Sequence, residues 1–187
     1  MFIQIEETPN PSTLKFLPGR AIMESEGAEF KSSQEAHTCL FAAQILEIKG
    51  VTSVFLGLDF VSVTKIEESD WFTLKPLILE CIVNYFATHE KVIITTRQKR
   101  TSGGVDDEIT QQIKELIDTR VRPAVAMDGG DIIFDKFENG VVYLQLQGAC
   151  SGCPSSSATL KEGIENMLRY YIPEVQEVRP VEHDALV

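Results

Sequence analysis

The chain passes from a strand-like run to a helix-like run at one cysteine-containing loop, Gly148-Ala149-Cys150-Ser151-Gly152-Cys153-Pro154. Before the loop, residues 141–147 alternate and are rich in β-forming side chains, which predicts a strand. After it, Pro154 suits the first turn of a helix, where its missing N–H costs nothing. Apolar side chains then recur at helical spacing up to Tyr171. The sequence therefore predicts a strand, a loop and a helix in that order.

The two cysteines of this loop stand at or just before the predicted helix N-terminus. Free backbone N–H groups and the positive end of the helix dipole favour a thiolate at that place. A thiolate is the form of cysteine that binds a metal or attacks a disulfide. Gly152 allows the loop to bend back, so that the sulfur atoms of Cys150 and Cys153 face one point. The loop is therefore a candidate metal or redox site.

The number of ligands favours a site that is shared between two chains. Structural zinc and the common iron–sulfur clusters take four protein ligands, usually cysteine or cysteine with histidine. The loop supplies two, and the histidines, His37, His89 and His183, lie far from it in sequence and form no second ligand pair. A two-fold dimer would bring two Cys150–Cys153 pairs together and complete four thiolates.

Two other chemistries remain open on spacing alone. A Cys-x-x-Cys pair is a weak motif by itself, and it is also typical of half a zinc site or of a thiol–disulfide oxidoreductase. In the redox reading, Cys150 would attack and Cys153 would resolve. A thioredoxin-type fold expects a βαβ unit before the pair, whereas a helix and a hairpin are predicted here. The other two cysteines, Cys39 and Cys81, fall on apolar helical stretches and are interpreted as small core residues.

The composition argues against several classes of function. The 187 residues are 43% hydrophobic and 24% charged, which is ordinary for a globular protein of one large or two small domains. The formal net charge of -11 disfavours general nucleic-acid binding, which depends on basic patches. No apolar run reaches the length of a membrane span, and the N-terminus resembles neither a secretory signal nor an Arg-rich transit peptide. Four cysteines without a regular framework indicate a reducing compartment.

The predicted fold class is α+β with two small domains. Residues 1–96 predict the order ββαββα. Strands over residues 1–6 and 13–17 come first, an irregular stretch covers 21–30, and a helix runs from Ser32 or Ser33 to about Glu47. A hairpin of residues 51–56 and 60–65 and a helix over about 71–87, capped by Asp70, complete this domain.

A flexible linker and a second domain follow. Residues 97–105 are polar, contain two consecutive glycines and show no periodicity, which predicts the linker. Residues 106–187 predict the order αββαβ. A helix starts at Asp106 or Asp107 and is kinked or ended by Pro123. A hairpin of residues 132–137 and 141–147 turns at Asn139-Gly140, and the cysteine loop, a helix and a final strand over 175–181 come after it.

Three motifs of the second domain resemble the NifU-like C-terminal domain. They are Val121-Arg122-Pro123-Ala124, Asp128-Gly129-Gly130-Asp131 and the cysteine loop continued through Ser155 and Ser156, in that order. The first domain is similar to the N-terminal domain of Nfu-type proteins, through residues 7–16 and 50–55. The two resemblances cover nearly the whole chain. The sequence is therefore identified as a member of the Nfu-type iron–sulfur cluster scaffold or carrier proteins.

The resemblance implies a function that the loop chemistry alone leaves open. Nfu-type proteins hold a labile [4Fe-4S] cluster between two subunits and pass it to apo-enzymes. By this resemblance Cys150 and Cys153 are the cluster and metal ligands, and the chain is a carrier without catalytic residues. The expected partners are apo iron–sulfur client proteins, upstream assembly factors and a second copy when the cluster is bound, with no nucleic acid and no membrane. The expected location is a bacterial cytoplasm, or the mitochondrial matrix for a processed eukaryotic form. A thiol–disulfide oxidoreductase is the alternative.

Overall fold

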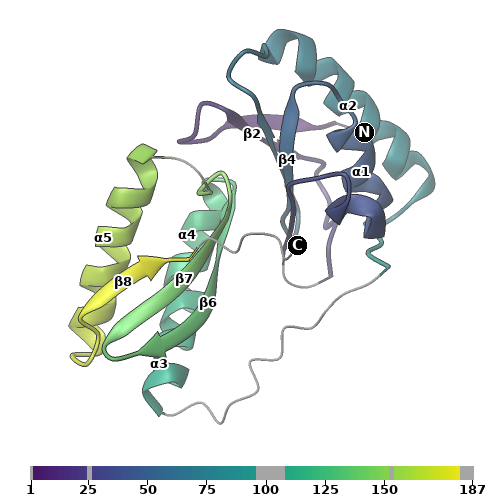
Figure 1. The fold of residues 1–187 in the computed structure, drawn as a ribbon. Coiled ribbons are helices and arrows are strands. Elements are labelled where there is room, and N and C mark those ends of the chain that lie inside the picture. Colours follow the sequence, from purple (N-terminus) through teal and green to yellow (C-terminus); the bar gives the residue numbers. More distant parts are fainter. Residues whose placement is uncertain (1, 25–26, 96–107, 152–153, 182–187) are drawn as a thin grey trace. The chain divides into compact units, whose positions relative to one another are not determined.

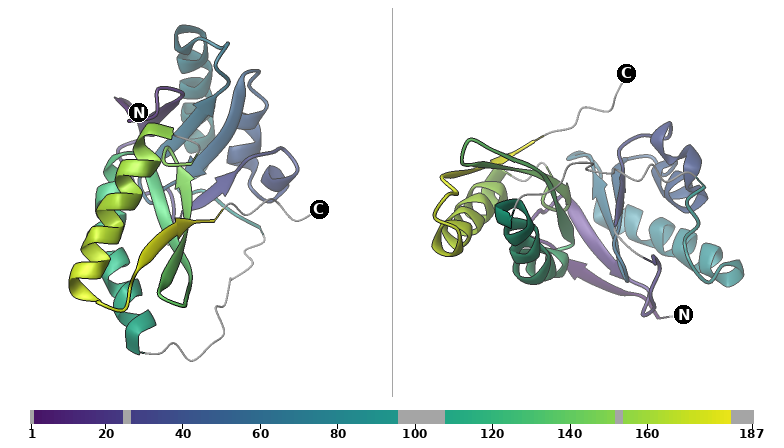
Figure 2. Two further views of the ribbon diagram at one scale, coloured as in Figure 1. Left: turned by 60° about the vertical axis from the view of Figure 1, so that its left-hand side comes forward. Right: turned by 90° about the horizontal axis from the view of Figure 1, so that it is seen from below.

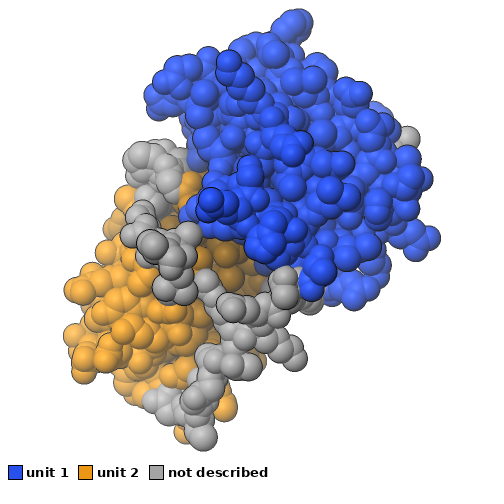
Figure 3. Space-filling view, turned by 45° about the vertical axis from the view of Figure 1, so that its right-hand side comes forward, with its two compact units in different colours: residues 1–99 blue, residues 100–187 orange. Residues whose placement is uncertain are grey.

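The computed structural model describes residues 2–24, 27–95, 108–151 and 154–181 (Figure 1). The chain divides into two compact units, Met1–Lys99 and Arg100–Val187, which Figure 3 shows in different colours. Each unit has its own hydrophobic core, and each combines helices with a sheet, so the α+β fold is as predicted. The predicted linker, residues 97–105, lies outside the described residues. In the described part of the chain, no helix is both long and apolar enough to cross a membrane.

The first unit is an antiparallel sheet with helices packed on one face. Its strands are β1 (Gln4–Glu7), β2 (Thr13–Leu17), β3 (Ala28–Phe30), β4 (Val51–Leu56) and β5 (Val61–Lys65), in the spatial order β1-β2-β5-β4-β3. Its helices are η1 (Glu35–Thr38), α1 (Leu40–Leu46) and α2 (Trp71–Thr88). Alternate residues of the strands, such as Phe16 on β2 and Val63 on β5, pack with Ile78 and Ile82 of α2. The period of two along each strand thus produces one apolar face for the helices.

One side chain, that of Asp70, caps the N-terminus of α2. The carboxylate of Asp70 accepts a hydrogen bond from the Phe72 N–H at 3.0 Å, so the predicted cap is confirmed. Pro76 lies inside this helix, in its second turn. The helix nevertheless starts at Trp71, because burial of its inner face compensates for the hydrogen bond that proline cannot donate.

Two parts of the first unit differ from the prediction. The helix expected from Ser32 or Ser33 to Glu47 is divided into η1 and α1 by Cys39, whose backbone is extended at φ -137° and ψ 97°. The stretch expected to be irregular contains the edge strand β3, which pairs with β4. Three residues are too few for a recognisable alternation. Pairing with a strand far away in sequence, and not local preference, makes this segment extended.

The second unit is a smaller sheet with helices on one face (Figure 2). Its strands are β6 (Gly130–Glu138), β7 (Val141–Gly148) and β8 (Glu177–Pro180), in the order β6-β7-β8. β6 and β7 form an antiparallel hairpin, and β8 lies parallel to β7. The crossover between these parallel strands is α5 (Pro154–Tyr171). Core side chains include Ile132 of β6, Leu144 of β7 and Leu168 of α5.

The first helical run of this unit contains a widened turn. It consists of α3 (Glu108–Leu116), the π-helical segment η2 (Ile117–Val121) and α4 (Arg122–Met127). The Arg122 N–H donates to the Ile117 carbonyl, five residues back. Pro123 follows directly and can neither donate a backbone hydrogen bond nor fit its ring into a regular turn. The helix therefore does not end at Pro123. It accommodates the proline by a locally widened, π-helical turn.

The core of the first unit generates a stability prediction. Ile78 is fully buried, and we expect Ile78→Ala to lower the free energy of unfolding by about 2–5 kcal/mol, since it removes buried methyl groups and leaves a cavity. Urea unfolding followed by fluorescence measures the change, because the single tryptophan, Trp71, lies on the same helix and packs against the same core. Val83→Ala on the exposed side of α2 is the control, with an expected change within about 0.5 kcal/mol. Equal effects of the two substitutions would contradict this assignment of the core.

Candidate functional site

The cysteine loop lies between the end of β7 and the start of α5, as predicted. Gly148 has a φ of 65°, and the Ser151 N–H donates to its carbonyl at 3.0 Å, so the chain turns sharply as it leaves the strand. Cys150 is 5% exposed and belongs to the second core. Gly152 and Cys153 lie outside the described residues, so the expected meeting of the two thiols stays a prediction.

A glycine pair brings a second backbone segment against this loop. In the β6–β7 ladder Gly130 is opposite Gly148, and the Ala149 N–H donates to the Gly129 carbonyl at 3.1 Å. A β-carbon placed on Gly130 would lie 2.7 Å from the sulfur of Cys150 and 2.8 Å from the backbone oxygen of Gln147. No residue other than glycine fits at position 130 while the thiol keeps this place.

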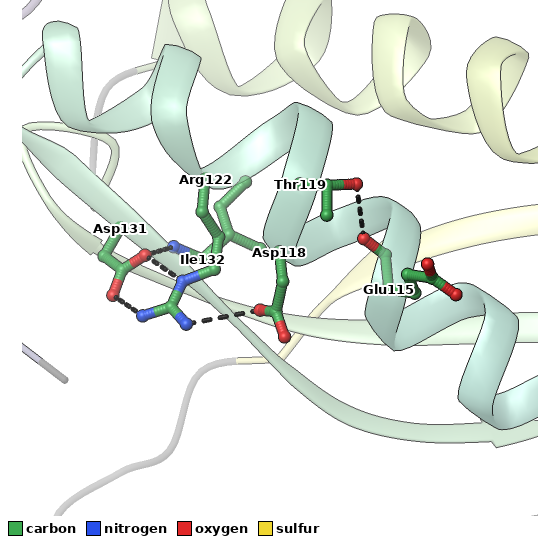
Figure 4. A network of polar contacts seen from close by, with 6 residues as sticks. All are labelled: Glu115, Asp118, Thr119, Arg122, Asp131 and Ile132. Carbon is green, nitrogen blue, oxygen red and sulfur yellow. Dashed lines mark hydrogen bonds and ion pairs between the residues drawn. The ribbon is translucent and has the colours of Figure 1, made fainter. Parts of the chain in front are cut away.

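An ion pair connects this glycine segment to the preceding helix (Figure 4). Arg122 donates from Nε to Asp131 Oδ1 at 2.8 Å and from Nη2 to Asp131 Oδ2 at 2.7 Å. It also donates from Nη1 to Asp118 at 3.2 Å. The Asp131 side chain is only 10% exposed and also accepts from the Ile132 N–H at 2.8 Å. The hydrogen bond to Asp131 raises the pKa of the Arg122 guanidinium above its ordinary value, so Arg122 stays protonated.

These contacts show how the family motifs around Arg122 and Asp131 come together in space, which sequence reasoning missed. In the sequence, Arg122, Gly130 and Asp131 serve only as parts of two family motifs, and no pattern predicts their contact with one another or with the cysteine loop. In the structure, Arg122 lies on α4, Asp131 is the second residue of β6 and Gly130 lies against the thiol of Cys150. A basic residue followed nine positions later by an acidic residue is not a recognisable signal, because the intervening turn decides whether the two meet.

The other candidate ligands lie elsewhere. Cys39 is fully buried in the core of the first unit, just before α1 rather than on it, and Cys81 of α2 is partly buried there. Burial raises the pKa of both thiols, which keeps them protonated at neutral pH. His37 and His89 also belong to the first unit, and His183 lies outside the described residues. Within the described ranges, no three His, Cys, Asp or Glu side chains gather as a metal site.

Two family models match the chain. The model described as "Scaffold protein Nfu/NifU N terminal" matches residues 3–89, and the "NifU-like domain" matches residues 113–179. The chain is also 48% identical over 186 residues to the human protein "NFU1 iron-sulfur cluster scaffold homolog, mitochondrial". The aligned residues make up 98% of this chain and 73% of that relative. The chain belongs to the Nfu family of scaffold proteins. The membership predicted from the three motifs is confirmed.

One further relative and one solved structure are also similar to parts or all of the chain. The protein of the same printed name from Drosophila persimilis is 45% identical over 188 residues, which are 99% of the chain and 67% of that relative. The chain thus spans between 67% and 73% of the length of these two Nfu proteins. The solution NMR structure of a NifU-like protein from Saccharomyces cerevisiae is 30% identical, with a TM-score of 0.46, over 50% of this chain and 84% of that one.

The close approach at Gly130 predicts opposite effects of two glycine substitutions. We expect Gly130→Ala to destabilise the second unit by about 1–3 kcal/mol, because the new methyl group overlaps Cys150 and the Gln147 carbonyl. Gly163→Ala in α5 is the matched control, since nothing lies within 4 Å of its added β-carbon. It is expected to stabilise the helix by about 0.5–1 kcal/mol. Calorimetric unfolding measures both, and a Gly130→Ala variant as stable as the unsubstituted protein would show that the thiol does not occupy this place.

Proposed function

We propose that this chain holds a labile [4Fe-4S] cluster through Cys150 and Cys153, shared between two copies, and transfers it to apo-proteins. The observation that carries the proposal is the thiol of Cys150 at the β7–α5 loop, three positions before a second cysteine, in a member of the Nfu family. The relatives from human and Drosophila are named as iron–sulfur cluster scaffold homologs. In this proposal the cluster is cargo, and the chain binds it without transforming it.

The ligand count supports a site between two copies. A [4Fe-4S] cluster is normally held by four cysteine thiolates, and the loop contributes two. Cys39 does not supply another, because it is fully buried in the core of the other unit. A second copy related by a two-fold axis presents the same two thiols and completes the set.

The surroundings of the loop suit a negatively charged cluster. The eighteen-residue helix α5 starts at Pro154, directly after the second cysteine, and its N-terminal end carries the positive end of the dipole. Two such helix ends, one from each copy, would stabilise the net negative charge of a thiolate-ligated cluster. A site formed between subunits also opens when the copies separate, which a carrier requires for release.

The partners and the location follow from the same proposal. The loaded form is a homodimer, which receives the cluster from upstream assembly factors and delivers it to apo iron–sulfur client proteins. The mitochondrial names of the relatives support the mitochondrial matrix as the place of action.

Cysteine substitutions test the proposed ligands. We expect Cys150→Ala and Cys153→Ala each to abolish cluster binding, because one missing thiolate per copy leaves two of the four ligands. Cys39→Ala and Cys81→Ala should keep the cluster and lower the stability of the first unit by about 1 kcal/mol. The measurement is anaerobic reconstitution with iron, sulfide and reductant, followed by iron and sulfide counting on a sizing column.

The same experiment decides between cluster binding and the alternatives. A brown dimer with about four irons and four sulfides per two chains supports the proposal. Cluster loss in the Cys39 or Cys81 variant would overturn the ligand assignment. A colourless monomer that forms a Cys150–Cys153 disulfide and reduces disulfide substrates would replace the proposal with thiol–disulfide exchange, and a dimer that retains zinc tightly would replace it with a structural site.

A further inference from the structure

We propose that the Arg122–Asp131 ion pair is a positioning device for the thiol of Cys150. The pair holds the start of β6 against α4, and this fixes Gly130 beneath the sulfur. The inference deepens the proposed function, and its consequence for the cluster rests on that function. Its first test needs no cluster, so the two proposals fail separately.

The first step from Arg122 to the thiol is the geometry of the ion pair. Two nitrogens of Arg122 meet two oxygens of Asp131, at 2.8 and 2.7 Å. A forked contact of this kind fixes orientation as well as distance, because both hydrogen bonds are lost when either group rotates. The third contact of the guanidinium, to Asp118 one helical turn back, keeps Arg122 against its own helix. The pair therefore attaches β6 to α4 in one defined arrangement.

The second step links Asp131 to the thiol. Asp131 follows Gly130 directly in the chain, and its Oδ1 also accepts from the Ile132 N–H, so the carboxylate fixes the backbone on its own strand. The space between Gly130 and Cys150 is filled so closely that even one methyl group would overlap the sulfur. The Ala149 N–H donates to the Gly129 carbonyl beside it. A shift of Gly130 is therefore passed directly to the cysteine loop.

The third step concerns the placement of Arg122 itself. The π-helical segment η2 ends at Val121, and the Arg122 N–H closes its last wide turn on Ile117. An inserted wide turn changes the direction in which the next residue of a helix points. Here it precedes the residue that reaches Asp131. The expansion that Pro123 imposes on the helix thus also directs the guanidinium towards the strand.

The chemistry explains why such a device is useful to a carrier. A thiolate that shares a cluster with a second copy must be presented at a defined position, and supporting contacts around a ligand commonly control both affinity and orientation. Cys150 lies in a loop, which is less precise than a strand or a helix. The ion pair compensates by connecting that loop, through Gly130, to the helix and the sheet.

The test is the rate at which Cys150 is alkylated in the cluster-free full-length protein, measured with iodoacetamide and assigned by peptide fragmentation. In the unsubstituted protein this thiol is almost completely shielded. We expect Arg122→Gln to accelerate its alkylation about tenfold, the size expected for losing a charge-assisted contact at a partly buried site. Arg122→Lys keeps the charge but not the fork and should give an intermediate rate.

The two halves of the pair should not be equivalent. Arg122→Gln leaves the carboxylate of Asp131, 10% exposed, without its cation, whereas Asp131→Asn leaves the guanidinium of Arg122, 29% exposed, with solvent and with its second carboxylate partner, Asp118. A buried charge without a partner is the worse of the two outcomes. We therefore expect the larger acceleration for Arg122→Gln, and the double variant should be less affected than the sum of the single ones.

Two control variants separate positioning from general destabilisation. Arg179→Gln breaks an equally forked pair, with Glu177 at 2.9 and 2.8 Å, on β8 beside the opposite end of β7. It should leave the rate at Cys150 within about twofold. Ile113→Val trims a fully buried side chain of the same core and lowers stability without touching the pair. At equal loss of melting temperature, it should accelerate alkylation far less than Arg122→Gln.

The outcomes are distinct. An unchanged rate in Arg122→Gln, or an equal increase in Ile113→Val of matched stability, overturns the positioning role. If the role is correct and the proposed function holds, Arg122→Gln also loses its reconstituted cluster faster than Arg179→Gln, followed by absorbance in the visible range. If the unsubstituted protein takes up no cluster while the alkylation results are as expected, the positioning role stands and the proposed function fails.

Discussion

The second unit depends on one close contact, in which the backbone of Gly130 lies directly against the sulfur of Cys150. Only the absence of a side chain at position 130 makes room for the thiol there. The β6–β7 ladder brings the two segments together, and the sharp turn at Gly148 directs the chain over Gly130 and onward to α5. The candidate ligand is therefore positioned by elements that are far apart in sequence.

The electrostatics of this unit serve the same arrangement. A nearly buried carboxylate at the start of a strand is costly unless a cation compensates it, and Arg122 supplies both charge and geometry to Asp131. The widened helical turn before Arg122 accommodates Pro123 within the helix. It also sets the direction in which the Arg122 side chain points. The first unit also contains buried polar contacts, such as the hydrogen bond between the hydroxyls of Thr13 and Thr64 and the ion pair of Lys15 with Glu6. Its stability comes mainly from apolar packing, such as that of Phe41 with Tyr85 and Phe86.

Sequence reasoning succeeded where structure is encoded locally. The β6–β7 hairpin was predicted from Asn139-Gly140, and both residues have the positive φ, 52° and 80°, that makes this pair a hairpin turn. Asp70 was predicted as a cap and accepts the expected hydrogen bond. Sequence reasoning failed where residues distant in the chain decide the local structure. Strand β3 exists because β4 pairs with it. The helix expected after β3 is interrupted at Cys39, whose burial in the core outweighs helical continuity.

The sequence by itself determined the order of most elements, the two-thiol loop and membership of the Nfu family, because periodicity, capping residues and short motifs are properties of neighbouring residues. Only the tertiary structure decided that Arg122 reaches Asp131 and that Cys150 is shielded against Gly130. Both contacts depend on the register of the β6–β7 ladder and on the turn between α4 and β6. A shift of one residue along β6 would turn the side chain of Asp131 to the other face of the sheet, away from Arg122, and no local pattern records that choice.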